Sequence, residues 1–200
     1  MISRAIVSTP QALPMTLKYT NIRSYVFTAV FVALSVAVPW VFHQFHLAGP
    51  TFLPMHIFVL VAGLLSGWRA GLIVGLLVPL SSYAVAGMPV LNILPQVTIE
   101  LAVYGLVAGV LREKFNLRPV WSLLGAMVAG RLALFVAVAV IYLITGAIYS
   151  PLGAETNPLL AVWSTIEQGW PGIVIQLALI PVIVWLVGKL TTKASKVDNP

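Results

Sequence analysis

The chain lacks cysteine and has few charged residues: Cys is absent from all 200 positions, and charged side chains make up 8%. The absence of cysteine excludes disulfides, thiolate metal sites and cysteine nucleophiles. The shortage of charge excludes an ordinary soluble domain, in which about a quarter of the residues are charged. Hydrophobic residues make up 60% instead. This composition predicts a membrane protein with several spans.

Common catalytic signatures are also missing, among them H-E-x-x-H, G-x-S-x-G and paired acids with metal-binding spacing. The only Gly-Lys pair, Gly188-Lys189, follows no glycine-rich loop and so is not a phosphate-binding loop. His43 and His46 have no third ligand nearby in sequence, which disfavours a metal site. We therefore expect no enzyme, no metal and no cofactor, and any active transport must draw its energy from a partner or an ion gradient.

Six apolar runs predict six transmembrane helices in one all-α bundle. They cover about residues 24–45, 53–66, 70–86, 94–111, 119–148 and 170–190. The connection 149–168 is the longest and is expected on the outer side of the membrane. The first 23 residues lack the apolar core of a signal peptide. We expect a cytoplasmic arm at 1–23, a six-helix domain at 24–190 and a cytoplasmic tail at 191–200.

Ten of the eleven Lys and Arg residues gather at the two chain ends and at alternate connections of these runs. The connections around 43–53, 81–93 and 148–168 contain none. Because cytoplasmic loops carry the excess of basic residues, both termini are predicted to lie inside. The same bias, with the anionic inner leaflet, explains the net charge of +6 without nucleic acid. Arg131, deep within the fifth run, is the exception.

Polar side chains recur every four residues in the fourth run, at Asn92, Gln96, Glu100 and Tyr104. This spacing places them on one side of a helix. Glu100 lies about 9 Å below the outer end of that helix, where a carboxylate should face the bundle interior, a partner or a cavity. Arg131 lies about 18 Å from the inner end of its own helix. It either neutralises Glu100 or holds an acidic group of a ligand.

Further candidate site residues lie near the predicted outer surface. Gln168 and Gln176 share a helical face with Gly172, whose small size would leave space between the two amides. Trp163 either stacks on a flat ligand or sits in the membrane interface. His56 either binds a ligand or bonds a free backbone carbonyl.

Small side chains lie along one face of the first run, at Ala29, Ala33 and Ala37. Such a face lets another helix approach closely. Either a neighbouring helix of the same bundle or a partner protein fits it.

The segment TFLPMHIFVLVAGLLSGWRAGLIVGLLVPLSSYAVAGMP, followed by LPQVTIELAVYGLVAGVLRE, resembles the substrate-binding S components of energy-coupling factor (ECF) importers. The resemblance implies a six-helix subunit of a prokaryotic cytoplasmic membrane. Such a subunit captures a water-soluble vitamin or related heterocyclic micronutrient from outside, then topples to deliver it with a transmembrane T component and two ATPases.

The resemblance also implies roles for particular residues. The alanine face would dock on the T component, and the loop from His43 to Thr51 would close as a lid. The pocket would lie near the outer surface, among the residues of the fourth to sixth runs named above. Glu100 and the amides would suit a pteridine-, pyrimidine- or deazaguanine-like ring, whereas Arg131 would suit an acid such as pantothenate.

Two other functions remain open from the residues alone. A solitary facilitator or proton-coupled carrier of a small polar solute would use Glu100 and Arg131 as a proton relay. A membrane enzyme would need a nucleophile or metal site that the sequence does not display.

Overall fold

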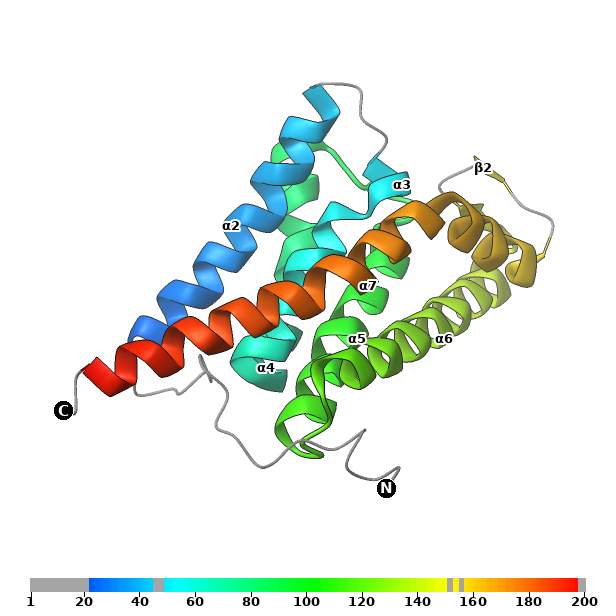
Figure 1. The fold of residues 1–200 in the computed structure, drawn as a ribbon. Helices are drawn as coiled ribbons and strands as arrows, with labels where there is room; N and C mark the ends of the chain where they lie inside the picture. Colours follow the sequence, from blue (N-terminus) through cyan, green and yellow to red (C-terminus); the bar gives the residue numbers. More distant parts are fainter. Residues whose placement is uncertain (1–21, 45–48, 151–152, 155–156, 198–200) are drawn as a thin grey trace.

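The structure, a computed structural model, describes residues 22–44, 49–150, 153–154 and 157–197, and these are almost entirely helical (Figure 1). The helices are α2 (Ile22–Gln44), α3 (Gly49–Phe52), α4 (Pro54–Ala86), α5 (Leu94–Glu113), α6 (Pro119–Thr145) and α7 (Pro158–Val197). Two short strands, β1 (Tyr149–Ser150) and β2 (Gly153–Ala154), pair antiparallel. Most of the expected N-terminal arm, His46 and the end of the expected tail lie outside the described residues.

The second and third predicted runs form a single element, α4, with a break in its middle. Gly67 has φ 86° and ψ 178°, a backbone conformation that residues with a side chain rarely adopt. A Cβ on Gly71 would lie 2.9 Å from the Cα of Gly63. Eight residues along a straight helix would be about 12 Å apart, so the chain folds back at Gly67. The Glu113 carboxylate accepts a hydrogen bond from the Trp68 backbone N–H there, at 3.2 Å.

Glycines let α4 and α5 pack with their backbones in contact. A Cβ on Gly63 would lie 2.6 Å from the carbonyl oxygen of Gly105, and a Cβ on Gly105 would overlap the backbone of Gly71. A Cβ on Gly75 would lie 2.8 Å from the Cα of Ala102. Close approach through small residues is the usual packing of helices in membranes. The hydrophobic core lies around this contact, with Leu60, Leu64 and Leu101 fully buried.

The last helix begins earlier than predicted, which corrects the expectation of a loop over 149–168. Residues 149–154 include the β1–β2 hairpin, and α7 starts at Pro158 rather than near Trp170. Asn157 accepts a hydrogen bond from the Leu159 backbone N–H through its side chain, at 2.8 Å. An Asn before a Pro in the first turn is a favourable helix start, a signal that hydropathy alone does not register. Similarly, α6 ends at Thr145 and Gly146 follows in a left-handed conformation.

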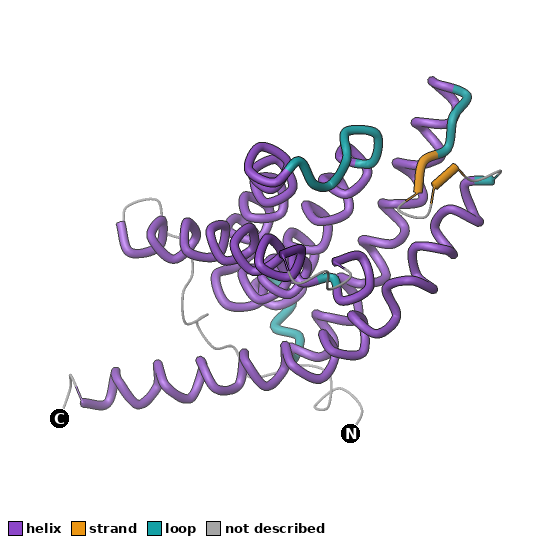
Figure 2. Tube along the Cα trace, turned by 90° about the horizontal axis from the view of Figure 1, so that it is seen from above, coloured by secondary structure: helices purple, strands orange, loops and turns teal. Residues whose placement is uncertain are grey.

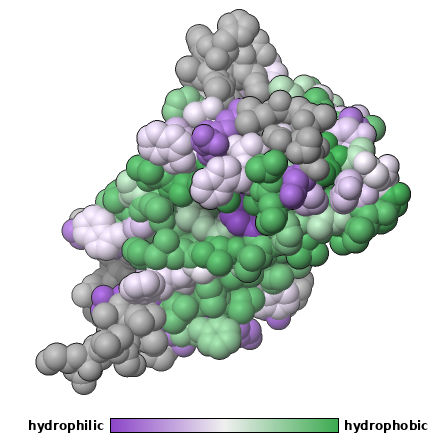
Figure 3. Space-filling model, turned by 90° about the vertical axis from the view of Figure 1, so that its right-hand side faces the viewer, coloured by the Kyte–Doolittle hydropathy of each residue, from purple (hydrophilic) through white to green (hydrophobic). Residues whose placement is uncertain are grey.

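Apolar side chains cover much of the outside of the bundle. Figure 3 shows a broad hydrophobic surface on the face that it displays. In the described part of the chain, four helical stretches are long and apolar enough to cross a membrane, namely Pro54–Ala86, Leu94–Glu113, Pro119–Thr145 and Pro158–Leu190. A shorter apolar stretch, Tyr25–Val41, lies within α2. Seen from above, α7 runs along one side of the bundle and the β1–β2 hairpin lies away from its centre (Figure 2).

Candidate functional site

A cavity of about 260 Å³ lies where the ends of several helices meet. Most of its walls are apolar and come from α2, the start of α4 and the connection between α4 and α5. The polar walls come from α4, α5, α6, β1 and α7, and they are His56, Glu100, Arg131, Ser150, Thr165 and Gln168. An apolar pocket with a few convergent polar groups is the usual form of a small-molecule site.

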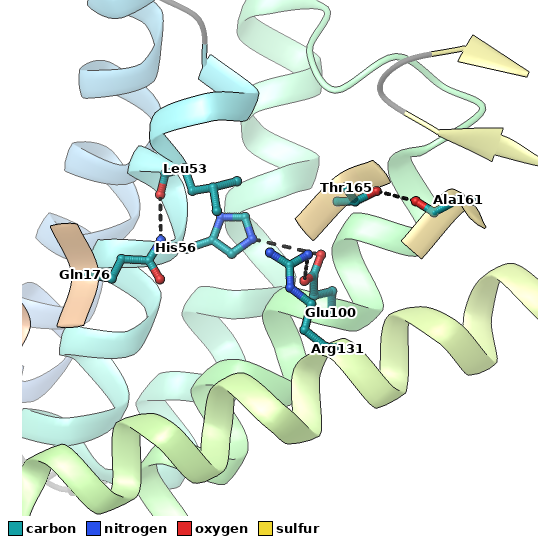
Figure 4. Close-up of polar contacts among 7 residues, drawn as sticks. All are labelled: Leu53, His56, Glu100, Arg131, Ala161, Thr165 and Gln176. Atoms are coloured by element: carbon teal, nitrogen blue, oxygen red, sulfur yellow. Dashed lines mark hydrogen bonds and ion pairs between the residues drawn. The ribbon is translucent and has the colours of Figure 1, made fainter. Parts of the chain in front are cut away.

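Glu100 and Arg131 form an ion pair within the bundle, as Figure 4 shows. The Arg131 Nη1 lies 2.8 Å from the Glu100 Oε1, and both side chains are largely buried. The Nε2 of His56 lies 3.9 Å from the Glu100 Oε2, which is too long for a hydrogen bond. The sequence left open whether Arg131 neutralises Glu100 or holds an acidic group of a ligand. In the structure, Arg131 pairs with Glu100.

Several polar atoms of this cluster have no hydrogen-bond partner among the described residues. They include both ring nitrogens of His56 and the Nε and Nη2 of Arg131. Leaving such an atom buried and unpaired costs about 1–3 kcal/mol. A ligand that supplies matching donors and acceptors at this wall would recover that energy.

Helix α7 presents one face to the cavity and to the start of α4. Thr165 and Gln168 line the cavity, and the Thr165 hydroxyl donates to the Ala161 carbonyl at 2.7 Å. Gln176, two turns further on, is buried and does not line the cavity. Its Nε2 donates to the Leu53 carbonyl at 3.5 Å. Gly172 leaves room for the backbone of Phe52 rather than for a space between two amides.

The four polar residues that recur every four positions along α5 and just before it lie in different environments. Asn92 is exposed, while Gln96, Glu100 and Tyr104 are buried. Only Glu100 of the four lines the cavity. The Nε2 of Gln96 has no hydrogen-bond partner among the described residues.

Tyr104 and Trp163 line a second, apolar cavity of about 600 Å³ between α6 and α7. Arg131 borders both cavities and therefore stands at their boundary. Trp163 is 64% exposed.

The sequence patterns did not identify Ser150 and Thr165 as cavity residues. A pattern in the sequence could have indicated Thr165 but not Ser150. Thr165 lies three residues before Gln168, so the helical spacing that linked Gln168 to Gln176 could have been extended to it. Ser150 reaches the cavity through the β1–β2 hairpin, whose fold no periodic pattern indicates.

The three alanines of α2 lie on the surface and line a groove of about 890 Å³ between α2 and the second half of α4. The far side of this groove is formed by Ile73, Leu77, Ser81 and Val85. The alanines are exposed, so they do not form a tight intramolecular packing face in the described part of the chain.

Part of the expected lid, from His43 to Thr51, lies outside the described residues. Its end is described: α3 packs on α7, and Leu53 follows in a left-handed conformation with φ 49°. Within the described ranges, no group of three or more His, Cys, Asp or Glu comes close enough to hold a metal ion.

A bundle of apolar helices around a small cavity with a buried polar wall is the architecture of a membrane protein that binds a small molecule. The chain belongs to the family of ECF transporter substrate-specific components, which it matches over residues 23–184. This match confirms the family resemblance drawn from the sequence and identifies a multi-pass membrane transport subunit. No curated protein and no solved structure matches the chain.

Proposed function

We propose that the chain is the substrate-capture subunit of an ECF-type importer in a prokaryotic cytoplasmic membrane, and that it binds a small uncharged heterocyclic micronutrient from outside. The observation that carries this proposal is the buried ion pair of Glu100 and Arg131 in the cavity wall. The charges of the carboxylate and the guanidinium cancel. A charged ligand would add an unbalanced charge to a buried site, which is unfavourable.

The chemistry of this wall favours a ring with adjacent donors and acceptors. The carboxylate of Glu100 can accept from a ring N–H, while the free nitrogens of Arg131 can donate to a neighbouring carbonyl or ring nitrogen. Pteridine-, pyrimidine- and deazaguanine-like edges carry such pairs. An acid such as pantothenate would draw Arg131 away from Glu100 and leave that carboxylate unpaired. The volume of about 260 Å³ also favours a compact ligand.

We further propose six crossings with both termini in the cytoplasm. The fold-back at Gly67 supports two crossings within α4. In Figure 1 the start of α2, the end of α7 and the connection between α5 and α6 lie toward the same end of the bundle. These are the places where basic residues gather, and the cavity is lined from the opposite helix ends. The positive-inside rule then places the cavity toward the outer surface.

Capture predicts that the purified chain retains a small molecule. Native mass spectrometry of the chain in detergent is expected to show a bound species, which is then released and identified. We expect an uncharged heterocycle whose affinity falls in Gln168→Leu, because this change removes a polar wall of the cavity. A wild-type chain that binds no heterocycle from a vitamin panel would contradict the proposal, as would Gln168→Leu with unchanged affinity.

The exposed alanine face supports docking on a T component, with two ATPases supplying energy. We expect Ala33→Trp to abolish uptake of the identified compound while leaving its binding unchanged, because Ala33 lines the α2–α4 groove and not the cavity. Uptake is measured in cells that express the T component and both ATPases.

Leu34→Trp is the matched control for this prediction. Leu34 is exposed on the same helix but does not line the groove, so uptake should persist. Equal loss in both variants would point to membrane insertion rather than docking. Uptake that continues without the ATPases would favour the solitary carrier instead.

A further inference from the structure

His56 stands at the cavity without a polar contact that fixes its ring. It lies in the first turn of α4 and is 7% exposed. Neither ring nitrogen has a hydrogen-bond partner among the described residues, and the Nε2 lies 3.9 Å from a Glu100 carboxylate oxygen. The orientation of the imidazole must therefore come from packing on its ring and from the position of its backbone.

On the ring side, Tyr104 packs against His56. The two ring centroids are 5.4 Å apart and the planes meet at 68°, an edge-to-face arrangement that aromatic rings favour. Tyr104 is not a wall of the cavity that His56 lines. It lies behind the imidazole and lines the second cavity, between α6 and α7.

Tyr104 can occupy this position because α6 has a glycine beside it. A Cβ on Gly130 would lie 2.7 Å from the Cδ1 and Cε1 atoms of the Tyr104 ring. A methyl group there would push the ring away from α6, in the direction of its other neighbours. Gly125, on the same helix, faces only the flexible end of Leu111.

On the backbone side, one carbonyl links α7 to the first turn of α4. The Leu53 carbonyl accepts from the His56 backbone N–H at 3.1 Å and from the Gln176 side chain at 3.5 Å. Figure 4 shows Gln176 reaching Leu53 on one side of His56, with Glu100 and Arg131 on the other. Leu53 has a left-handed backbone, a strained conformation for a residue with a side chain.

Gly172 completes this contact. A Cβ there would lie 2.7 Å from the carbonyl carbon and oxygen of Phe52. The absence of a side chain at Gly172 thus lets residues 51–53 lie against α7, within reach of Gln176.

We propose that Tyr104 and Gln176 are positioning residues: seated by Gly130 and Gly172, they hold His56 against the cavity from two sides without contacting the ligand. This role rests on the proposed capture site and replaces the ligand contacts that the sequence suggested for both residues. It makes the two glycines determinants of substrate affinity, although neither lines the cavity.

Nuclear magnetic resonance of histidine-labelled protein in detergent tests the proposal without any ligand. The chain has only three histidines, and His56→Gln assigns the resonances of interest. Gly130→Ala, Tyr104→Leu and Gln176→Leu are each expected to move the His56 ring-proton resonances by more than their linewidth. Tyr104→Phe keeps the ring and should stay closer to wild type than Tyr104→Leu.

Gly125→Ala and Gly188→Ala are the matched controls, on α6 and α7 respectively. A Cβ on Gly188 would meet no heavy atom within 4 Å. Both controls should leave the His56 resonances in place. The proposal is overturned if Gly130→Ala and Gln176→Leu leave them unchanged in a folded protein, or if the controls move them equally.

This experiment also separates the positioning role from the capture function. If the variants shift the His56 resonances but the wild-type chain binds no heterocycle, the positioning role is upheld and the capture site is contradicted. If the variants leave the resonances unchanged and the wild-type chain binds a heterocycle, the capture site is upheld and the positioning role is contradicted. A thermal unfolding curve for each variant shows that the protein compared is folded.

Discussion

Glu100→Gln is expected to reduce affinity for the captured compound by about 100-fold or more. Hydrogen bonds to a charged group contribute about 1.5–3 kcal/mol each, and a loss of about 2.7 kcal/mol corresponds to 100-fold. Among the described residues, Glu100 is the only one that brings a carboxylate to the cavity walls, and the substitution removes it. It also leaves Arg131 buried without its partner, which costs about 3–5 kcal/mol of stability. Isothermal titration with the identified compound and thermal unfolding in detergent measure the two effects.

A double variant separates the effect on binding from the effect on folding. Glu100→Gln combined with Arg131→Gln removes both buried charges, so the unfolding midpoint should return toward that of wild type. Affinity should remain low, because both ligand-binding charges are gone. If the double variant recovers affinity together with stability, the ion pair is structural and the proposed site is wrong.

Gly105→Ala is expected to destabilise the fold at the contact between α4 and α5. The added methyl group would overlap the backbone of Gly71, and backbone cannot move aside as a flexible side chain can. Overpacking typically costs about 1–3 kcal/mol and occasionally more. At about 3 kcal/mol, the unfolding midpoint of a domain this size should fall by about 6–12 °C. Thermal unfolding in detergent, followed by circular dichroism, measures the change.

Gly188→Ala is the control for Gly105→Ala. Its methyl group would meet open space, and alanine favours a helix over glycine by about 1 kcal/mol. The midpoint should therefore stay the same or rise slightly. A Gly105→Ala midpoint within 2 °C of wild type, on the order of the shift expected for 1 kcal/mol, would contradict the close backbone contact of α4 and α5.

Helix periodicity predicted one part of the site because it acts within a single element. The four-residue spacing in α5 correctly indicated that Gln96, Glu100 and Tyr104 share the buried side of a helix. It did not separate Glu100, which lines the cavity, from Tyr104, which lies behind His56. That distinction depends on the neighbouring helices, and spacing along one helix carries no information about them.

The extent of α7 shows a second limit of sequence patterns. Hydropathy placed its start near Trp170, whereas the helix begins at Pro158. The extra turns carry Thr165 and Gln168 to the cavity. Hydropathy alone does not distinguish a polar helical turn from a loop. The hydrogen bond of the Asn157 side chain marks the start of the helix.

The sequence by itself determined the class of this protein and its family, because composition, hydropathy and the residues of α4 and α5 are properties of the chain before it folds. It also identified Glu100 and Arg131 as buried charges that require partners. Only the tertiary structure decided that they pair with each other, that His56 lies beside them and that Gln176 bonds to Leu53 instead of facing the cavity. The physical reason is the backbone contact between glycines far apart in sequence, which fixes the distances between helices and thereby the side chains that meet.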